Sequence, residues 1–279
     1  MALYLLKSMD EQATQNTCCN GGKLMSQSFS EVFMEFERIT GQIEDVQLLA
    51  QQGLTSEVRK VIAKNGTYLL KSSFKEKYRA WLKKEAEILE TLLGSELAVP
   101  KYYSYLAEIH QNHLLMSFEQ GVSLTAALQE ATTEKEKQAL ARSFGQFLHE
   151  LHEQSPILTL QHEGNWLEQQ LIQAQHYAEK GQCDGDLHLL AQLKANKLLP
   201  VEQTMIHGDC TTDNVLVVGG KVQLFIDVAG MTIGDSRYDE ALAIRKLKKH
   251  PELIAAFYEG YQRNGMSEKE FVYFNDGLY

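Results

Sequence analysis

The most informative stretch of the chain reads HGDCTTDN at residues 207–214, VLVV at 215–218, GG at 219–220 and KVQLFID at 221–227. Two apolar, β-branched runs joined by Gly-Gly predict a β-hairpin with a two-residue turn. If Val218 pairs with Lys221, the ladder places Asn214 opposite Phe225, and Asp227 shares the side-chain direction of Phe225. Asn214 and Asp227 are then diagonal neighbours on one face, about 7–8 Å apart at Cα.

An amide oxygen and a carboxylate on one face suit a hard divalent cation. Mg²⁺ prefers oxygen ligands and keeps waters or substrate phosphates among them. Asp209 comes just before the first strand of the hairpin and is the third member of the set. Taken one at a time, an Asp or Asn beside a hairpin is equally well explained as a turn former. The prediction of a metal-assisted phosphoryl-transfer site therefore rests on all three residues together.

The pattern HGDxxxxN, followed by an apolar hairpin and Ile-Asp, resembles the catalytic and metal-binding segments of the aminoglycoside phosphotransferase family. The nearest branch is that of the aminoglycoside 3′-phosphotransferases, and the resemblance extends from about residue 43 to the C-terminus. This family shares the protein-kinase-like fold, with a catalytic-loop Asp and Asn and a second, metal-binding Asp. The resemblance implies that Asp209 is the catalytic base, that Asn214 and Asp227 bind Mg²⁺, and that His207 is a structural residue under the loop.

The resemblance also implies the fold class, an α+β, two-lobed protein-kinase-like fold. A small N-terminal β-sheet lobe with one helix precedes a larger, mostly helical C-terminal lobe. We expect a flexible N-terminal tail at residues 1–27, a nucleotide-binding lobe at 28–118 and a catalytic and substrate-binding lobe at 119–279. Periodicity and turn signals predict helices at 29–39 and 75–93 and strands at 46–49, 57–62, 67–71, 100–105 and 114–118.

Lys71 ends a predicted strand, and alternation puts it on the same face as Leu69. Read alone, it is an edge lysine with its stem on the sheet. The following helix carries an apolar stripe that contains Glu85, and a carboxylate on an inward face needs a partner. Lys71 and Glu85 therefore resemble the ion pair that orients a lysine toward the nucleotide phosphates. Glu87 and Glu90 fall off the stripe.

Two further segments are assigned to the nucleotide by resemblance. The turn GLTSEV at 53–58 resembles the phosphate-covering loop of the family, and Thr55 stands where that family tends to place a serine. A single Gly in such a loop is also consistent with an ordinary turn. The run at 114–122 resembles the hinge that binds adenine, and the backbone of Ser117 and Glu119 is our choice for those contacts.

The acceptor region carries weaker signals. An amphipathic helix is expected over residues 165–186, leading into an acidic run, and Glu179, Asp184 and Asp186 stand loosely where the aminoglycoside branch holds substrate ammonium groups. A solvated helix face explains them as well. The C-terminus keeps the aromatic helix of that branch but not its terminal acidic cluster. Downstream of the hairpin, Asp235 is a candidate N-cap, and Asp239 matches the aspartate that supports the catalytic loop.

The composition of the chain limits the classes of binding partner that we expect. The 279 residues carry a formal net charge of −10, so a nucleic-acid partner is not expected. The charge is compatible with a small, cationic, hydroxyl-bearing substrate. No apolar run approaches the ~20 residues that span a bilayer, and the beginning of the chain lacks a signal-peptide pattern. The four cysteines show no metal spacing, so a reducing cytoplasm is the simplest setting.

These observations predict an ATP- or GTP-dependent phosphotransferase that uses Mg²⁺ and an alcohol group of a small molecule as acceptor. An aminoglycoside-like acceptor is the first choice, and choline, thiamine or sugar-type acceptors are alternatives. A non-catalytic nucleotide-binding module and, less favoured, a metallohydrolase stay open as other classes. The oligomeric state and the preference between ATP and GTP are not determined by the sequence.

Overall fold

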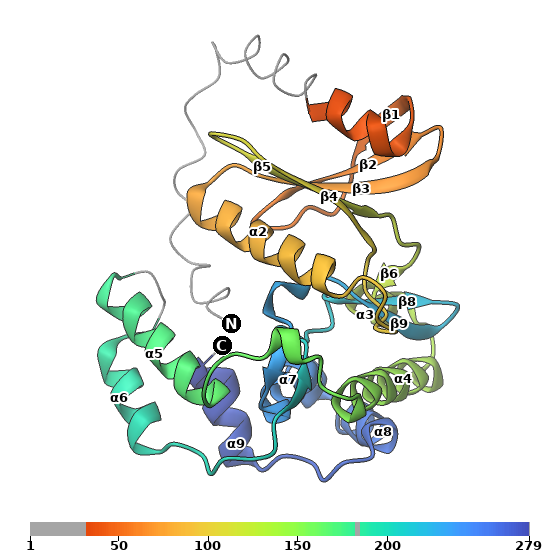
Figure 1. Cartoon of the computed structure of the whole chain (residues 1–279). Helices are drawn as coiled ribbons and strands as arrows, with labels where there is room; N and C mark the ends of the chain where they lie inside the picture. The colour runs from red at the N-terminus through yellow and green to blue at the C-terminus, as the bar shows by residue number, and fades with distance from the viewer. Residues whose placement is uncertain (1–31, 182–184, 279) are drawn as a thin grey trace, which may run out of the picture. The chain divides into compact units, whose positions relative to one another are not determined.

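The computed structural model describes residues 32–181 and 185–278, which form two compact units that divide between Gln120 and Gly121 (Figure 1). The sequence predicts this boundary between Phe118 and Glu119. The tail expected at residues 1–27 lies outside the described residues. Within the described part of the chain, no helix combines the length and apolar character needed to cross a membrane.

The N-terminal unit is built on one antiparallel sheet with the strand order β1-β2-β3-β5-β4. It contains a helix over residues 32–40, β1 (Ile43–Leu48), β2 (Glu57–Ala63), β3 (Gly66–Ser73), α2 (Glu76–Thr91), β4 (Tyr102–Ala107) and β5 (Asn112–Ser117). The elements predicted for this region are present, with ends that shift by a few residues. Alternating polarity in the strands and a 3.6-residue apolar period in α2 account for this agreement.

Helices cover both faces of this sheet. Val32 and Phe36 of the first helix join a buried cluster with Tyr68, Leu70 and Leu115. Helix α2 packs against β3, β4 and β5 and contributes Leu82, Ala86 and Leu89 to the core. Because side chains alternate along β3, Leu70 points to the first helix and Lys71 points to α2.

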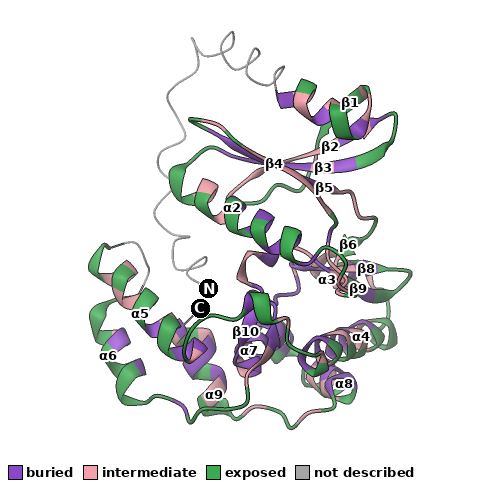
Figure 2. Ribbon diagram, viewed as in Figure 1, coloured by how far each residue is buried: buried purple, intermediate pink, exposed green. Residues whose placement is uncertain are grey.

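The C-terminal unit is mostly helical and carries two small antiparallel sheets, β6-β8-β9 and β10-β7. Its strands are β6 (Val122–Ser123), β7 (Thr204–Ile206), β8 (Val215–Val218), β9 (Lys221–Phe225) and β10 (Thr232–Gly234). Its helices are α3 (Leu124–Glu130), α4 (Glu134–Glu153), α5 (Trp166–Glu179), α6 (Leu187–Ala195), α7 (Ser236–Ile244), α8 (Pro251–Tyr261) and α9 (Glu268–Val272). Helices α4 and α8 lie side by side, and α7 is buried along almost its whole length (Figure 2).

The β8–β9 hairpin forms as predicted, but its register differs. Gly219 and Gly220 both have positive φ, 57° and 80°, which is the two-residue turn that Gly-Gly favours. Val218 pairs with Lys221, but Gln223 is an extra residue in β9, so Val215 rather than Asn214 pairs with Phe225. The prediction that Asn214 faces Phe225 is therefore wrong, because a β-bulge shifts the ladder by one residue.

The single helix predicted over residues 165–186 is also wrong. Helix α5 ends at Glu179, and Asp186 is the N-cap of α6, where its Oδ1 accepts a hydrogen bond from the N–H of Leu189 at 2.8 Å. An aspartate favours this position because its side chain satisfies a backbone donor that the helix leaves open. Asp186 therefore has a structural role that the sequence interpretation missed.

Candidate active site

The segment at 207–214 forms a tight loop between β7 and β8. Gly208 has a φ of 78°, and a Cβ there would lie 2.2 Å from the carbonyl oxygen of Gly230. Only glycine allows both this left-handed conformation and this close backbone contact. The loop is thus packed directly against the segment that follows Asp227.

The carboxylate of Asp239, in α7, holds the backbone of the loop through hydrogen bonds. Its Oδ2 accepts the N–H of His207 at 2.5 Å, and its Oδ1 accepts the N–H of Gly208 at 2.8 Å. His207 is fully buried, and its Nε2 donates to the carbonyl oxygen of Ile226 at 2.9 Å. The Nδ1 of the same ring accepts the N–H of Asp209 at 3.2 Å. Both side chains therefore fix the backbone that carries Asp209.

Asp209 is buried, and its two carboxylate oxygens have different surroundings. Oδ2 accepts a hydrogen bond from Nδ2 of Asn214 at 2.9 Å, whereas Oδ1 is buried with no hydrogen-bond partner among the described residues. Burial raises the pKa of Asp209 to about 7, and the negative charge of Asp227 adds to this shift. A carboxylate that has one oxygen without a hydrogen-bond partner among the described residues, and a pKa of about 7, suits proton transfer near neutral pH.

The two proposed metal ligands differ in exposure. Asn214 is buried, and its Nδ2 also donates to the carbonyl oxygen of Asp209 at 2.9 Å, so its Oδ1 points away from this residue. Asp227 is exposed and leaves β9 in the left-handed conformation, with φ 58° and ψ 50°. A non-glycine residue held in this conformation is typical of functional sites. The amide oxygen of Asn214 and the carboxylate of Asp227 are oxygen donors of the kind that fits Mg²⁺.

In the N-terminal unit, Lys71 and Glu85 form a buried ion pair. Nζ of Lys71 donates to both carboxylate oxygens of Glu85, at 2.8 and 3.0 Å, and the side chains are only 10% and 6% exposed. Glu87, which falls off the apolar stripe, is exposed on α2. The pairing holds the ammonium group in one direction. Its role toward nucleotide phosphates stays a prediction.

Thr55 lies in the connection between β1 and β2, and its carbonyl oxygen accepts a hydrogen bond from Oγ of Ser73 at 3.0 Å. Ser73 is fully buried at the end of β3. Sequence reasoning missed Ser73, although its spacing of two from Lys71 was a usable signal, because residues i and i+2 share a face of a strand.

One of the backbone groups proposed to bind adenine, the N–H of Ser117, already has a hydrogen-bond partner. The N–H of Ser117 donates to the carbonyl oxygen of Lys101 at 2.9 Å, so this N–H is already used within the sheet. The Ser117 hydroxyl accepts the N–H of Lys101 and donates to the carboxylate of Glu119. Of the backbone groups proposed for adenine, the N–H of Ser117 is thus the least suitable.

Of the three acidic residues proposed for the acceptor, the structure describes Glu179 and Asp186, and each is hydrogen-bonded within its own helix. Glu179, at the end of α5, accepts a hydrogen bond from Gln175 at 2.7 Å on an exposed helix face. Asp186 caps α6, and Asp184 lies outside the described residues. Their role toward the acceptor stays a prediction.

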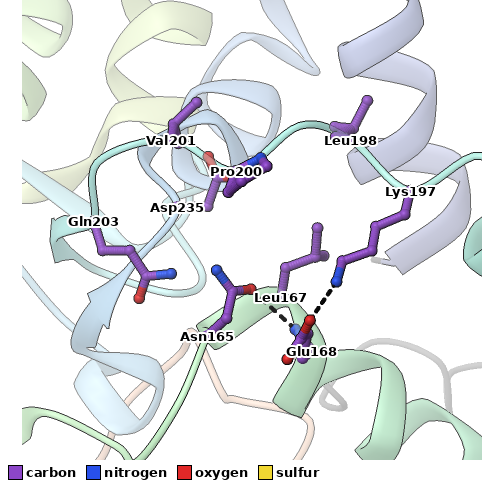
Figure 3. A pocket seen from close by; sticks show the side chains of 9 residues that line it. All are labelled: Asn165, Leu167, Glu168, Lys197, Leu198, Pro200, Val201, Gln203 and Asp235. Carbon is purple, nitrogen blue, oxygen red and sulfur yellow. Dashed lines mark hydrogen bonds and ion pairs between the residues drawn. The ribbon is translucent and has the colours of Figure 1, made fainter.

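A small cavity of about 170 Å³ lies in the C-terminal unit (Figure 3). The beginning of α5 and the connection at 197–203 frame it, and the ion pair of Lys197 with Glu168 stands at its edge. Asp209, Asn214 and Asp227 are not among its lining residues. Gln203 and Asp235, which line it, adjoin the Thr204–Gly234 end of the β7–β10 pair, and the catalytic loop leaves from the other end.

Solved structures with this architecture establish the fold. An aminoglycoside-3′-phosphotransferase of type VIII matches with a TM-score of 0.70 and 17% identity over 90% of this chain and 98% of that chain. The aminoglycoside phosphotransferase APH(3″)-Id from Streptomyces rimosus matches with a TM-score of 0.66 and 16% identity over 90% and 98%. The predicted α+β, protein-kinase-like fold is confirmed.

The family follows from the sequence itself. The model of the phosphotransferase enzyme family matches residues 46–272, and the chain belongs to this family. The predicted class of enzyme, a phosphotransferase with an alcohol group as acceptor, is confirmed at this level. No curated protein matches the chain.

Proposed function

We propose that the chain transfers the γ-phosphoryl group of ATP or GTP to a hydroxyl of a small, cationic molecule of the aminoglycoside type. The observation that carries this proposal is Asp209, a buried carboxylate with one oxygen that lacks a partner among the described residues, in a loop fixed from below by Asp239. Two structures of similar fold support the substrate classes. One was solved with ADP and streptomycin, and another with gentamicin.

In this proposal Asp209 orients the acceptor hydroxyl and takes its proton as the hydroxyl oxygen bonds to the γ-phosphorus. The bond from the γ-phosphorus to the bridging oxygen breaks, and the nucleoside diphosphate leaves. Lys71, held by Glu85, contacts the nucleotide phosphates, and the loop at Thr55 covers them. The backbone of Ser117 and Glu119 contacts the base. Asn214 and Asp227 would hold Mg²⁺, which would supply positive charge to offset the charge on the phosphoryl oxygens.

The test is a coupled assay of nucleoside diphosphate release with Mg·ATP and Mg·GTP against aminoglycosides, choline, thiamine and sugars. Asp209→Asn keeps the size and the hydrogen-bonding shape but removes the base, so we expect kcat to fall at least about 100-fold. Asp213→Asn is the matched control. It removes a carboxylate of the same loop that is paired with Lys246 at 2.5 Å and half-exposed, and kcat should change less than about threefold.

Turnover of one acceptor that is lost in Asp209→Asn and retained in Asp213→Asn supports the proposal. Equal loss in both variants contradicts a specific role of Asp209. Tight binding of Mg·nucleotide without turnover of any acceptor contradicts the enzymatic proposal and favours a nucleotide-binding module.

A further inference from the structure

The connection between β1 and β2 does not obtain its shape from glycine. Gly53 is its one glycine, and it does not adopt a positive φ. A Cβ on Gly53 would lie 3.6 Å from the carbonyl oxygen of Ser56, which is an ordinary contact. Glycine-rich phosphate loops rely on conformations that only glycine adopts. Other interactions must therefore hold this connection in place.

One anchor is at the base of the connection. The side chain of Gln52 donates to the carbonyl oxygens of Leu49 and Val58, at 2.6 and 2.8 Å, and accepts the N–H of Val58 at 2.8 Å. This amide closes the connection by joining Leu49, just after β1, to Val58, the second residue of β2. Gln52 itself is exposed, so this anchor alone is weak.

The second anchor comes from β3 and is fully buried. The hydroxyl of Ser73 donates to the carbonyl oxygen of Thr55 at 3.0 Å and lies 2.6 Å from the hydroxyl of Ser56. Because its single hydrogen is used on Thr55, Ser73 accepts from Ser56. One side chain therefore fixes a backbone carbonyl and a hydroxyl of neighbouring loop residues.

Ser73 shares its strand and its face with Lys71, two residues earlier. Lys71 is held by Glu85 of α2, so this part of β3 is rigid. Strand geometry sets the separation of residues i and i+2 at about 6.6 Å. The loop is thereby positioned by the same strand that presents the lysine proposed to contact the phosphates.

We propose that Ser73 is a positioning residue for the nucleotide, which orders the loop at 53–56 relative to Lys71. This inference rests on the proposed phosphotransfer function, and it goes further by assigning the order of the loop to a side chain outside it. In this proposal Ser73 acts through the loop and not on the nucleotide itself. Its contribution is that the loop needs no ordering when the nucleotide binds.

The test compares Ser73→Ala with Ser72→Ala. Ser72 is the matched control because it is the adjacent serine, is also fully buried and bonds Nδ1 of His113 at 2.8 Å on the opposite face of the sheet. Binding of Mg·ATP and Mg·GTP is measured by titration calorimetry, KM and kcat by the coupled assay, and loop order by hydrogen exchange of residues 50–58.

We expect Ser73→Ala to raise Kd and KM for the nucleotide about five- to tenfold, with kcat and the acceptor KM within twofold of wild type. Exchange at 50–58 should become faster. Ser72→Ala should lower the melting temperature and leave nucleotide Kd and exchange at 50–58 unchanged.

Unchanged nucleotide affinity in Ser73→Ala overturns the inference, and so does an equal loss of affinity in both variants. Both outcomes presuppose that wild type binds Mg·nucleotide. If wild type binds neither Mg·ATP nor Mg·GTP, the proposed function fails, and this inference fails with it. If wild type binds the nucleotide and Ser73→Ala binds it equally well, only this inference fails.

Discussion

Asp239 illustrates how a single side chain organises the candidate site. It accepts two backbone N–H groups from the loop, and Nε2 of His152 lies 3.5 Å from its Oδ2. Nδ1 of His152 is in turn 2.8 Å from the hydroxyl of Tyr261. Each partner comes from a different element, so the geometry of the catalytic loop depends on the packing of α4, α7 and α8.

The Lys71–Glu85 pair allows function to be separated from stability. Glu85→Leu leaves the ammonium buried without this carboxylate, and we expect a loss of about 3–5 kcal/mol in the free energy of unfolding. The double variant Lys71→Met, Glu85→Leu should recover most of that loss, because two apolar side chains replace a buried pair. Urea unfolding measures the stability of each variant.

The same double variant should not recover activity, since no ammonium is left for the phosphates. Recovery of both stability and kcat in the double variant would contradict the proposed role of Lys71. Arg59→Met with Glu57→Leu is a control, because that pair is more exposed and its removal should change stability by less than about 1 kcal/mol.

At the scale of helices, the contact between α4 and α8 depends on two glycines. A Cβ on Gly145 would lie 2.0 Å from the carbonyl oxygen of Phe257, and a Cβ on Gly260 would lie 2.0 Å from that of Arg142. The two backbones thus meet without intervening side chains. Tyr261 follows Gly260 directly, so this close approach also sets the distance from its hydroxyl to His152.

Gly145→Ala tests this packing. Alanine favours a helix over glycine by about 1 kcal/mol, so propensity alone predicts stabilisation. The clash with backbone atoms cannot be relieved by a rotamer change, and it should cost about 2 kcal/mol or more, as overpacking does. We therefore expect a lower melting temperature in calorimetry. Gly53→Ala, where the added methyl meets only ordinary contacts, is the control, and a higher melting temperature for Gly145→Ala would refute the packing argument.

At the scale of the whole molecule, buried neutral histidines link stability to pH. Burial lowers the pKa of His152 and of His207 below the usual 6.5, even though the carboxylate of Asp239 acts in the opposite direction on both. The unfolded chain then binds these protons more readily than the folded chain. Their contribution to stability is complete above pH 6.5 and is lost as the pH falls toward the lowered values.

We expect the free energy of unfolding to be nearly constant between pH 7 and 8 with respect to these two groups. Below pH 6.5 it should fall by about 1.4 kcal/mol per pH unit for each histidine. Urea titrations at pH 7.5, 6.5 and 5.5 measure this slope. His152→Gln should reduce it, whereas His250→Gln, an exposed position, should not, and an unchanged slope in His152→Gln would contradict the assignment.

Much of the architecture follows from local sequence. Four features could be predicted because each depends on residues only a few positions apart. They are the Gly-Gly turn, the alternation of β3, the apolar stripe of α2 that includes Glu85, and the N-cap at Asp235. The motif at 207–214 indicated the family for the same reason, because its residues occupy eight adjacent positions.

The tertiary structure alone decided the rest. The bulge at Gln223 shifts the hairpin register. Asp227 is held in a left-handed conformation that no local sequence pattern predicts. Ser73 meets Thr55 across 18 positions, and Asp239 meets His207 across 32. Such contacts arise from how strands and helices pack, and packing is set by the summed burial of many side chains and not by any short stretch of sequence.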